Sequence, residues 1–194
     1  MGQPEKNPDR KFTYKDYLTW PEQEHWELIN GIPYNMTPAP STQHQKIVTT
    51  LIALFYNALK DSPCQVFGAP FEVRLPEQEN NREDIFTVVQ PDLAIICDRN
   101  KLDSRGCLGS PDLIIEVTSP STLRKDIKEK FYLYEKAGVN QYWMIYPEQK
   151  TVVVFCLDKE GKYGRPDIYC ETDIIQAATD KSISIDLSEI FQEY

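Results

Sequence analysis

The chain has 194 residues, of which 41% are hydrophobic and 11% aromatic, so it can bury a full core and fits a single domain. Its formal net charge of -9 disfavours a protein that coats nucleic acid through its overall field, but it permits one local basic patch and bound metal ions. No run approaches the roughly 18 apolar residues of a membrane helix, and the polar start lacks the apolar stretch of a signal peptide. We therefore expect a cytoplasmic protein without membrane contact.

The five cysteines are widely spaced and include no Cys-x-x-Cys pair. This pattern disfavours both a disulfide framework and a zinc site. Cys97 and Cys156 each follow an apolar, strand-like run, so we expect them to be reduced and to serve as small core residues.

The N-terminal stretch is polar and contains two prolines, which predicts a flexible arm over 1–12 and a single domain over 13–194. A short amphipathic segment begins after Thr13, whose hydroxyl is suited to cap a helix.

A β-hairpin is predicted over 25–36. Asn30-Gly31 separates two mostly apolar runs there, and both residues tolerate a positive φ. Glu27 lies on the first arm, where strand alternation by itself would turn it toward solvent.

A helix is predicted over 43–60, because apolar residues recur at helical spacing and Pro63 follows. The residues of that face are Ile47, Leu51, Leu54, Phe55 and Ala58. His44 lies at the edge of the face, where a histidine more often makes one hydrogen bond than acts as a base or ligand.

The second half alternates apolar runs with one polar, basic helix. Strands are expected at 71–75, 86–97, 112–118, 141–146, 151–157 and 168–170, with a last strand and a short helix over 182–191. A helix over 123–137 separates two of these strands, which favours a βαβ crossover with parallel pairing. Gly138 falls where a left-handed cap would end that helix.

Two apolar runs carry one carboxylate each, Asp92 at the entrance of one strand and Glu116 near the end of another. Carboxylates rarely lie in buried strands unless they are paired or bind a cation. A divalent metal is the simplest partner, because Mg²⁺ prefers oxygen ligands and keeps several waters. Such an ion can polarise a phosphodiester and lower the pKa of an attacking water.

The helix over 123–137 can supply a cation beside these carboxylates. Asp126, Lys130 and Tyr134 are spaced four apart and share one face. Arg124 and Lys128 lie on a neighbouring face, so positive charge gathers near Glu116 despite the acidic total.

Simpler interpretations remain open for each residue. Asp92 follows Pro91 and could serve only in a turn or cap. Glu116 could form a structural ion pair with Lys130, and Lys130 by itself would usually be solvated.

The whole pattern resembles the PD-(D/E)XK nuclease superfamily, with its restriction-endonuclease-like fold, and more closely the Uma-type branch of endonucleases. The residues that carry the likeness are Glu27 in Glu-Leu-Ile-Asn-Gly, Pro40-Ser41, His44, Pro91-Asp92, Glu116-Val117, Ser119-Pro120-Ser121, Asp126, Lys130, Tyr134, Ala137-Gly138-Val139 and Tyr142-Trp143. The match extends from about Trp20 to Phe191.

The resemblance implies an α/β (mixed α+β) fold with a central mixed sheet flanked by helices. It also implies a magnesium or manganese site with Asp92 and Glu116 as ligands and Glu27 as a further acidic residue. The superfamily's lysine two residues after Glu116 is Thr118 here, so we expect Lys130 to take that role from the helix.

These features lead to a hypothesis of a metal-dependent DNA endonuclease. Asp92 and Glu116 would bind metal, Lys130 would position or activate water, and Glu27 would assist. Supporting residues would be His44, Ser119, Ser121, Arg124, Asp126 and Tyr134, of which Ser119, Ser121 and Arg124 could contact phosphates. A homodimer is expected, because two copies of one site cut both strands most simply.

Two alternatives remain. One is a nuclease-fold protein that no longer cuts and acts as a binding or regulatory module, favoured by the net charge of -9 and the missing motif lysine. The other is a transposition-associated nuclease that depends on a partner for target choice.

Overall fold

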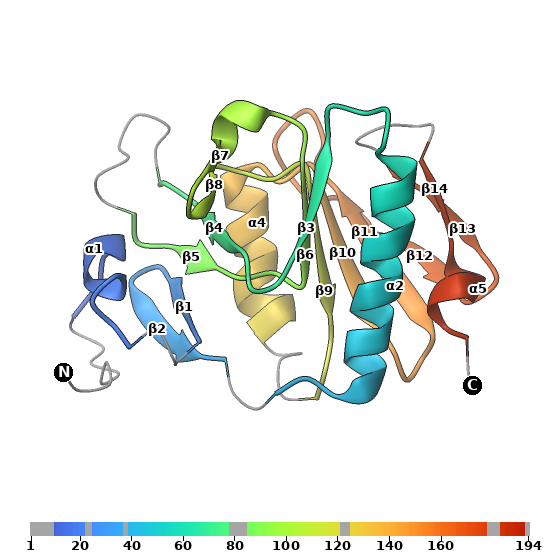
Figure 1. The fold of residues 1–194 in the computed structure, drawn as a ribbon, viewed down its shortest axis with the longest axis horizontal. Coiled ribbons are helices and arrows are strands. Elements are labelled where there is room, and N and C mark those ends of the chain that lie inside the picture. Colours follow the sequence, from blue (N-terminus) through green and yellow to red (C-terminus); the bar gives the residue numbers. More distant parts are fainter. Residues whose placement is uncertain are drawn as a thin grey trace.

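The strands of this computed structural model form two six-stranded β-sheets and a two-stranded ribbon in the described part of the chain (Figure 1). The structure describes residues 10–21, 25–36, 39–77, 85–120, 125–177 and 183–192. No helix in these ranges is both long enough and apolar enough to cross a membrane.

The helices are α1 (Tyr14–Tyr17), α2 (Thr42–Ala58), the 3-10 turn η1 (Arg99–Lys101), the π-helical turn η2 (Asp126–Lys130), α4 (Phe131–Ala137) and α5 (Leu187–Ile190). The strands are β1 (Trp26–Ile29), β2 (Ile32–Asn35), β3 (Gln65–Gly68), β4 (Glu72–Arg74), β5 (Val88–Val89), β6 (Leu93–Ile96), β7 (Leu102–Asp103), β8 (Gly106–Leu108), β9 (Leu113–Val117), β10 (Gln141–Tyr146), β11 (Thr151–Cys156), β12 (Asp167–Cys170), β13 (Ile174–Gln176) and β14 (Ser184–Asp186).

The central sheet has the strand order β12-β11-β10-β9-β6-β3 and is mixed. β9 and β10 are parallel and are joined through η2 and α4, which confirms the predicted βαβ crossover. Helix α2 covers one face of this sheet and α4 the other (Figure 1). Side chains of β9 therefore alternate between two cores: Leu113 and Ile115 pack on the α2 side, and Ile114 on the α4 side.

The second sheet has the order β2-β1-β5-β4-β8-β7. The single strand predicted over 86–97 is wrong, because the chain changes sheets within it. β5 pairs with β1 and β4, whereas β6 pairs with β3 and β9 of the central sheet. The break contains Pro91, which has no N–H to give to a ladder. Asp92 consequently lies where the two sheets meet.

Local sequence signals explain several of the boundaries. Asn30 (φ 51°) and Gly31 (φ 82°) form the hairpin turn between β1 and β2, as predicted. Gly138 (φ 80°) ends α4 in the left-handed region. Thr13 caps α1 with a reciprocal capping box, and the Ser41 hydroxyl accepts the His44 N–H at the start of α2.

The expectation for the cysteines is wrong in two respects. Cys64 and Cys97 form a disulfide, although 33 positions separate them. β3 and β6 pair antiparallel with Gln65 opposite Ile96. Cys64 and Cys97 are the next residues beyond this pair, so they lie opposite each other. Cys156 is exposed and does not lie in the core.

The expected N-terminal arm lies mostly in residues 1–9, outside the described residues. Phe12 is 7% exposed and packs edge-on against Trp20, and its N–H donates to the Gly31 carbonyl. The last residue of the expected arm thus contributes to a small core under β1.

Candidate active site

The β6–β9 register places the two predicted metal ligands at one end of the central sheet. Leu93 is paired with Ile115, so one step further Asp92 lies beside Glu116. The Val117 N–H donates to the Asp92 carboxylate Oδ2 at 2.7 Å. A backbone contact from the neighbouring strand therefore fixes the Asp92 side chain.

His44 holds the same carboxylate from the first turn of α2. Its Nε2 lies 3.1 Å from Asp92 Oδ2, while its Nδ1 is buried without a partner in the described structure. A donor at Nε2 suits the carboxylate, so His44 orients Asp92. This single bond agrees with the simpler expectation for His44.

Lys130 is 3% exposed and points into the site, so the expectation of a solvated lysine does not hold. Its ammonium lies 2.6 Å from Glu116 Oε1 and 2.9 Å from Glu27 Oε1. The Tyr134 hydroxyl, one helical turn further on, donates to Glu116 Oε1 at 2.8 Å. Glu116 is therefore held by two groups of one helix face.

Glu27 is fully buried, contrary to the solvent-facing position that alternation alone favours. β1 is covered on all four of its residues, so its outward side is also an interior surface. The Glu27 carboxylate contacts Lys130, lies 2.6 Å from Lys125 Nζ and accepts the Gln90 N–H at 3.2 Å. Two ammonium groups compensate the burial of its charge.

Lys125 is a site residue that the sequence reasoning missed. Regular α-helical spacing places Asp126, Lys130 and Tyr134 on one face, and Lys125 off it. The π-helical turn η2 closes with a bond from the Phe131 N–H to the Asp126 carbonyl, five residues back. Residues five apart then overlie each other, which brings Lys125 and Lys130 to the same carboxylate. Periodicity offered no signal for this turn.

The electrostatics of the site are set by burial and by crowded carboxylates. Burial raises the pKa of Glu116 to about 8; Asp126, Asp92 and Glu27 act in the same direction, and Lys130 opposes them. Burial also works against the ionised form of Glu27, but Lys130 and Lys125 outweigh it and lower the pKa of Glu27. Burial would lower the pKa of Lys130, yet Glu116 and Glu27 raise it well above its ordinary value.

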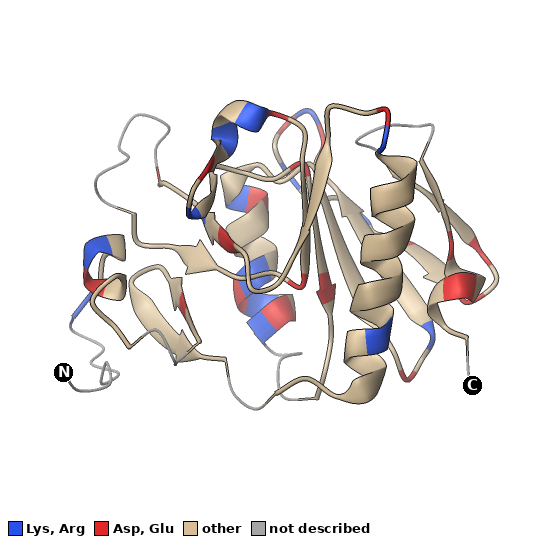
Figure 2. Ribbon diagram, viewed as in Figure 1, with Lys and Arg blue, Asp and Glu red and all other residues tan. Residues whose placement is uncertain are grey.

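A cleft of about 920 Å³ opens over these groups, and its walls include Asp92, Glu116, Asp126, Lys125 and Lys130. Figure 2 shows charges of both signs gathered where η2 and α4 approach the central sheet. Glu129 and Glu148 line the cleft as well, so with Glu27 six carboxylates face two ammonium groups, an excess of four negative charges when all are ionised.

The donor set fits a hard divalent cation. Carboxylate oxygens of Asp92 and Glu116 face one cleft, and Mg²⁺ needs only one or two such ligands beside water and phosphate oxygens. Asp92 and Glu116 are the candidate ligands, since no group of three or more His, Cys, Asp or Glu side chains in the described residues is placed to hold a metal ion. An open site of this kind leaves coordination positions for substrate.

The structure places most of the predicted site residues around one cleft. Direct contacts join Glu27, Lys130, Glu116 and Tyr134, and join His44 and Asp92. Ser119 and Asp126 line the same cleft, while Ser121 and Arg124 lie outside the described residues.

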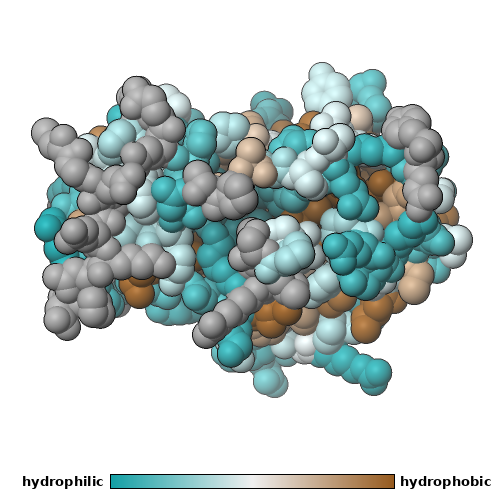
Figure 3. Space-filling view, turned by 90° about the horizontal axis from the view of Figure 1, so that it is seen from below, coloured by the Kyte–Doolittle hydropathy of each residue, from teal (hydrophilic) through white to brown (hydrophobic). Residues whose placement is uncertain are grey.

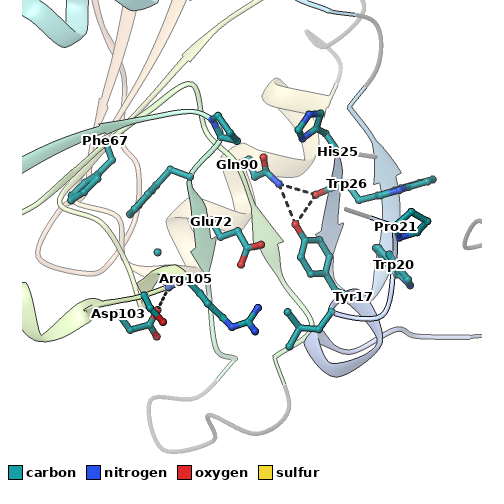
Figure 4. A pocket seen from close by; sticks show the side chains of 15 residues that line it. Tyr17, Trp20, Pro21, His25, Trp26, Phe67, Glu72, Gln90, Asp103 and Arg105 are labelled. Atoms are coloured by element: carbon teal, nitrogen blue, oxygen red, sulfur yellow. Dashed lines mark hydrogen bonds between the residues drawn. The ribbon is translucent and has the colours of Figure 1, made fainter. Parts of the chain in front are cut away.

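Gln90 links the cleft to a second cavity of about 570 Å³, shown in Figure 4. Its backbone N–H donates to Glu27, and its side-chain amide donates to the Tyr17 hydroxyl at 3.1 Å and the Trp26 carbonyl at 3.4 Å. In Figure 4 the Gln90 and Tyr17 side chains point toward each other across the wall of this aromatic cavity. Gln90 thereby braces β1, and with it Glu27.

Comparison with known proteins decides the family. Residues 14–188 match the model of the Uma2 family, which is described as "Putative restriction endonuclease". The chain belongs to the Uma2 family. One relative, "Uncharacterized protein slr1290" of Synechocystis sp. (strain ATCC 27184 / PCC 6803 / Kazusa), is 31% identical over 140 residues, 71% of this chain and 70% of the relative.

The fold of this Uma2 protein also has a solved counterpart. A crystal structure of a "putative nuclease belonging to DUF820" from Anabaena variabilis superimposes with a TM-score of 0.73 at 17% identity, over 93% of this chain and 97% of that one. The predicted restriction-endonuclease-like fold, a central mixed sheet flanked by helices, is confirmed.

Proposed function

We propose that this Uma2 protein is a metal-dependent endonuclease that hydrolyses phosphodiester bonds of DNA. One observation carries the proposal: Asp92 and Glu116 lie side by side at the end of the central sheet, with the Lys130 ammonium 2.6 Å from Glu116. Asp92 and Glu116 would hold Mg²⁺ or Mn²⁺, which supplies Lewis-acid polarisation of the phosphate and a more acidic bound water.

The protein groups have separable roles in this proposal. Lys130 places a positive charge where a phosphate and an attacking water would meet, and Glu27 orients Lys130 from its far side. Tyr134 fixes the Glu116 carboxylate, and His44 fixes that of Asp92.

Lys130 replaces the missing motif lysine. Thr118 occupies the motif position, is 8% exposed and donates its hydroxyl to the Ile145 carbonyl at 2.9 Å. The ammonium comes from the helix instead, which supports a migrated lysine in the proposed mechanism.

Cleavage of DNA tests this proposal directly. Wild-type protein with Mn²⁺ is expected to nick supercoiled DNA and to cut linear DNA, and the Asp92→Asn, Glu116→Gln double variant is expected to be inactive. Asp61→Asn changes an exposed carboxylate three residues after α2 and serves as a control with wild-type activity. Equal cleavage by the wild type and the double variant would refute the assignment.

A non-cutting nuclease-fold module is the second candidate. The observation that favours it is the burial of Lys130 between Glu116 and Glu27, which neutralises its charge in the absence of metal. Metal binding that depends on Glu116 separates the two candidates, since a module without an active centre has no need of the ion.

We also propose that the protein acts as a homodimer, because two copies can address both strands of a duplex. The face seen in Figure 3 is mainly hydrophilic, with hydrophobic side chains in separate patches, so this face favours a polar interface over a large apolar one. Light scattering is expected to give twice the mass of one chain at micromolar concentration. A monomer mass would remove this proposal and leave the site unaffected.

A further inference from the structure

A third cavity, a groove of about 410 Å³, lies beside η2 and α4. Lys128, Tyr132 and Lys136 form its helical wall, and Asn30 and Ile32 of the β1–β2 hairpin form the opposite wall. We call it the lysine groove.

The lysine groove adjoins the cleft. Tyr34 and Glu129 line both cavities. Lys125 Nζ lies 5.8 Å from the centre of the Tyr34 ring, so a cation of the candidate active site stands at the junction. A strand bound in the cleft therefore lies next to the lysine groove.

The charges of the lysine groove favour an anionic polymer. Lys128, Tyr132 and Lys136 line this one groove, so they share one face of the helix. All three are exposed, and Tyr132 is 65% exposed. The two lysines are separated by about 12 Å along the helix axis.

Of the carboxylates of this helix, Glu129 lines the lysine groove, whereas Asp126 and Glu135 do not. Burial and a hydrogen bond to Glu129 raise the pKa of Tyr34 to about 12, so the Glu129 carboxylate is turned to the junction. Glu135 pairs with Lys162 at 2.9 Å and accepts the Tyr163 N–H at 2.8 Å. In a protein with a net charge of -9, the lysine groove is thus a local exception to the repulsive field.

Two cations with an exposed aromatic ring between them are suited to a single nucleic-acid strand. Lysines hold phosphates without regard to sequence, and an aromatic ring stacks on an unpaired base. A duplex keeps its bases stacked on each other and has no face to offer Tyr132.

We propose that the lysine groove holds a single DNA strand as it leaves the cleft, with Lys128 and Lys136 on its phosphates and Tyr132 against a base. This inference rests on the proposed nuclease function, because the cleft must contain the strand that enters the groove. It assigns a substrate-binding surface outside the catalytic groups.

Salt dependence of binding tests the two lysines. Fluorescence anisotropy of a labelled single-stranded oligonucleotide is measured with Ca²⁺ in place of Mg²⁺ at several salt concentrations. In the Lys128→Gln, Lys136→Gln double variant, the magnitude of the slope of log affinity against log salt is expected to decrease by about 1.4, because each of the two lost phosphate contacts contributes ~0.7. Lys60→Gln, Lys159→Gln protein loses the same charge at exposed positions that line neither cavity, and its slope should match the wild type.

A matched pair of tyrosines tests the stacking contact. Tyr132 and Tyr56 are each 65% exposed and lie on helices, but only Tyr132 lines the lysine groove. Tyr132→Ala is expected to weaken single-strand binding by about 5- to 150-fold. Tyr132→Phe should bind like the wild type, Tyr56→Ala should have no effect, and duplex affinity should not respond to Tyr132→Ala.

Parallel cleavage assays separate this inference from the proposed function. The inference is overturned if the groove variants bind like their matched controls while the wild type cuts DNA. It is upheld, with the nuclease function rejected, if binding depends on the groove but no cleavage occurs. A wild type that neither binds nor cuts DNA overturns both.

Discussion

Replacing Lys130 by methionine is expected to lower the free energy of unfolding by about 3–5 kcal/mol, the cost of leaving buried charges without their partner. Lys130 is the shared cation of Glu116 and Glu27, which are 5% and 0% exposed. Its removal leaves Glu116 with the Tyr134 hydroxyl and Glu27 with Lys125. Urea or guanidinium denaturation measures the loss.

A second substitution separates the structural role of Lys130 from its chemical role. Glu116→Gln in the Lys130→Met background replaces the buried carboxyl group that has lost its cation by a neutral amide and keeps a Tyr134 contact, so much of the lost stability should return. Cleavage should not return, because both a metal ligand and the site cation are then absent. Lys125→Met is the comparison variant. Because the Lys125 side chain is 18% exposed and pairs with Glu27, this substitution should lower the free energy of unfolding less than Lys130→Met does. A stable and active Lys130→Met protein would contradict both roles.

Metal affinity is expected to depend most strongly on Glu116 and Asp92. Each neutral isostere, Glu116→Gln or Asp92→Asn, should weaken Mn²⁺ binding by more than about 100-fold, because a first ligand contributes more than an outer-shell partner. His44→Gln disturbs only the orientation of Asp92 and should cost about 10–100-fold. Isothermal titration calorimetry measures these affinities.

Unfolding experiments test the same metal ligands independently, because a bound metal stabilises the folded protein. At a metal concentration 100 times the Kd, the free energy of unfolding of the wild type should rise by about 2.7 kcal/mol. The metal should not stabilise the Glu116→Gln variant in this way. The Asp61→Asn variant changes an exposed carboxylate three residues after α2. It should bind metal like the wild type and show the same rise in the free energy of unfolding. Wild-type affinity in both Glu116→Gln and Asp92→Asn would exclude these residues as ligands and favour the non-cutting module.

Local sequence patterns were sufficient for elements whose cause lies within a few residues. Asn30-Gly31 predicts its hairpin because only residues tolerant of positive φ complete that turn. The apolar spacing before Pro63 predicts α2, and Gly138 marks the end of α4. The order of strand, helix and strand also predicts the parallel β9–β10 pair.

The sequence located much of the candidate site for a related reason. A carboxylate inside an apolar strand requires a partner, which drew attention to Asp92 and Glu116. The four-residue spacing of Asp126, Lys130 and Tyr134 predicted one helix face, and Lys130 and Tyr134 do share the Glu116 oxygen. Family resemblance contributed Glu27, whose position in the hairpin carried no such signal.

Other features were decided by contacts between distant parts of the chain. Cys64 and Cys97 meet because β3 and β6 pair, and Glu27 is buried because β1 packs against neighbours from several segments. Lys125 enters the site through a π-helical turn that 3.6-residue periodicity does not predict. The disulfide, the burial of Glu27 and the position of Lys125 therefore do not follow from the sequence pattern around each residue.

Sequence alone was enough to identify the two acidic residues and their approximate strand positions, because a charged residue inside an apolar run is a local anomaly. The tertiary structure sets Asp92 beside Glu116, because the chain changes sheets at Pro91. It also decided that one ammonium, that of Lys130, joins Glu116 to Glu27, since strand register and helix packing bring together atoms that are far apart along the chain.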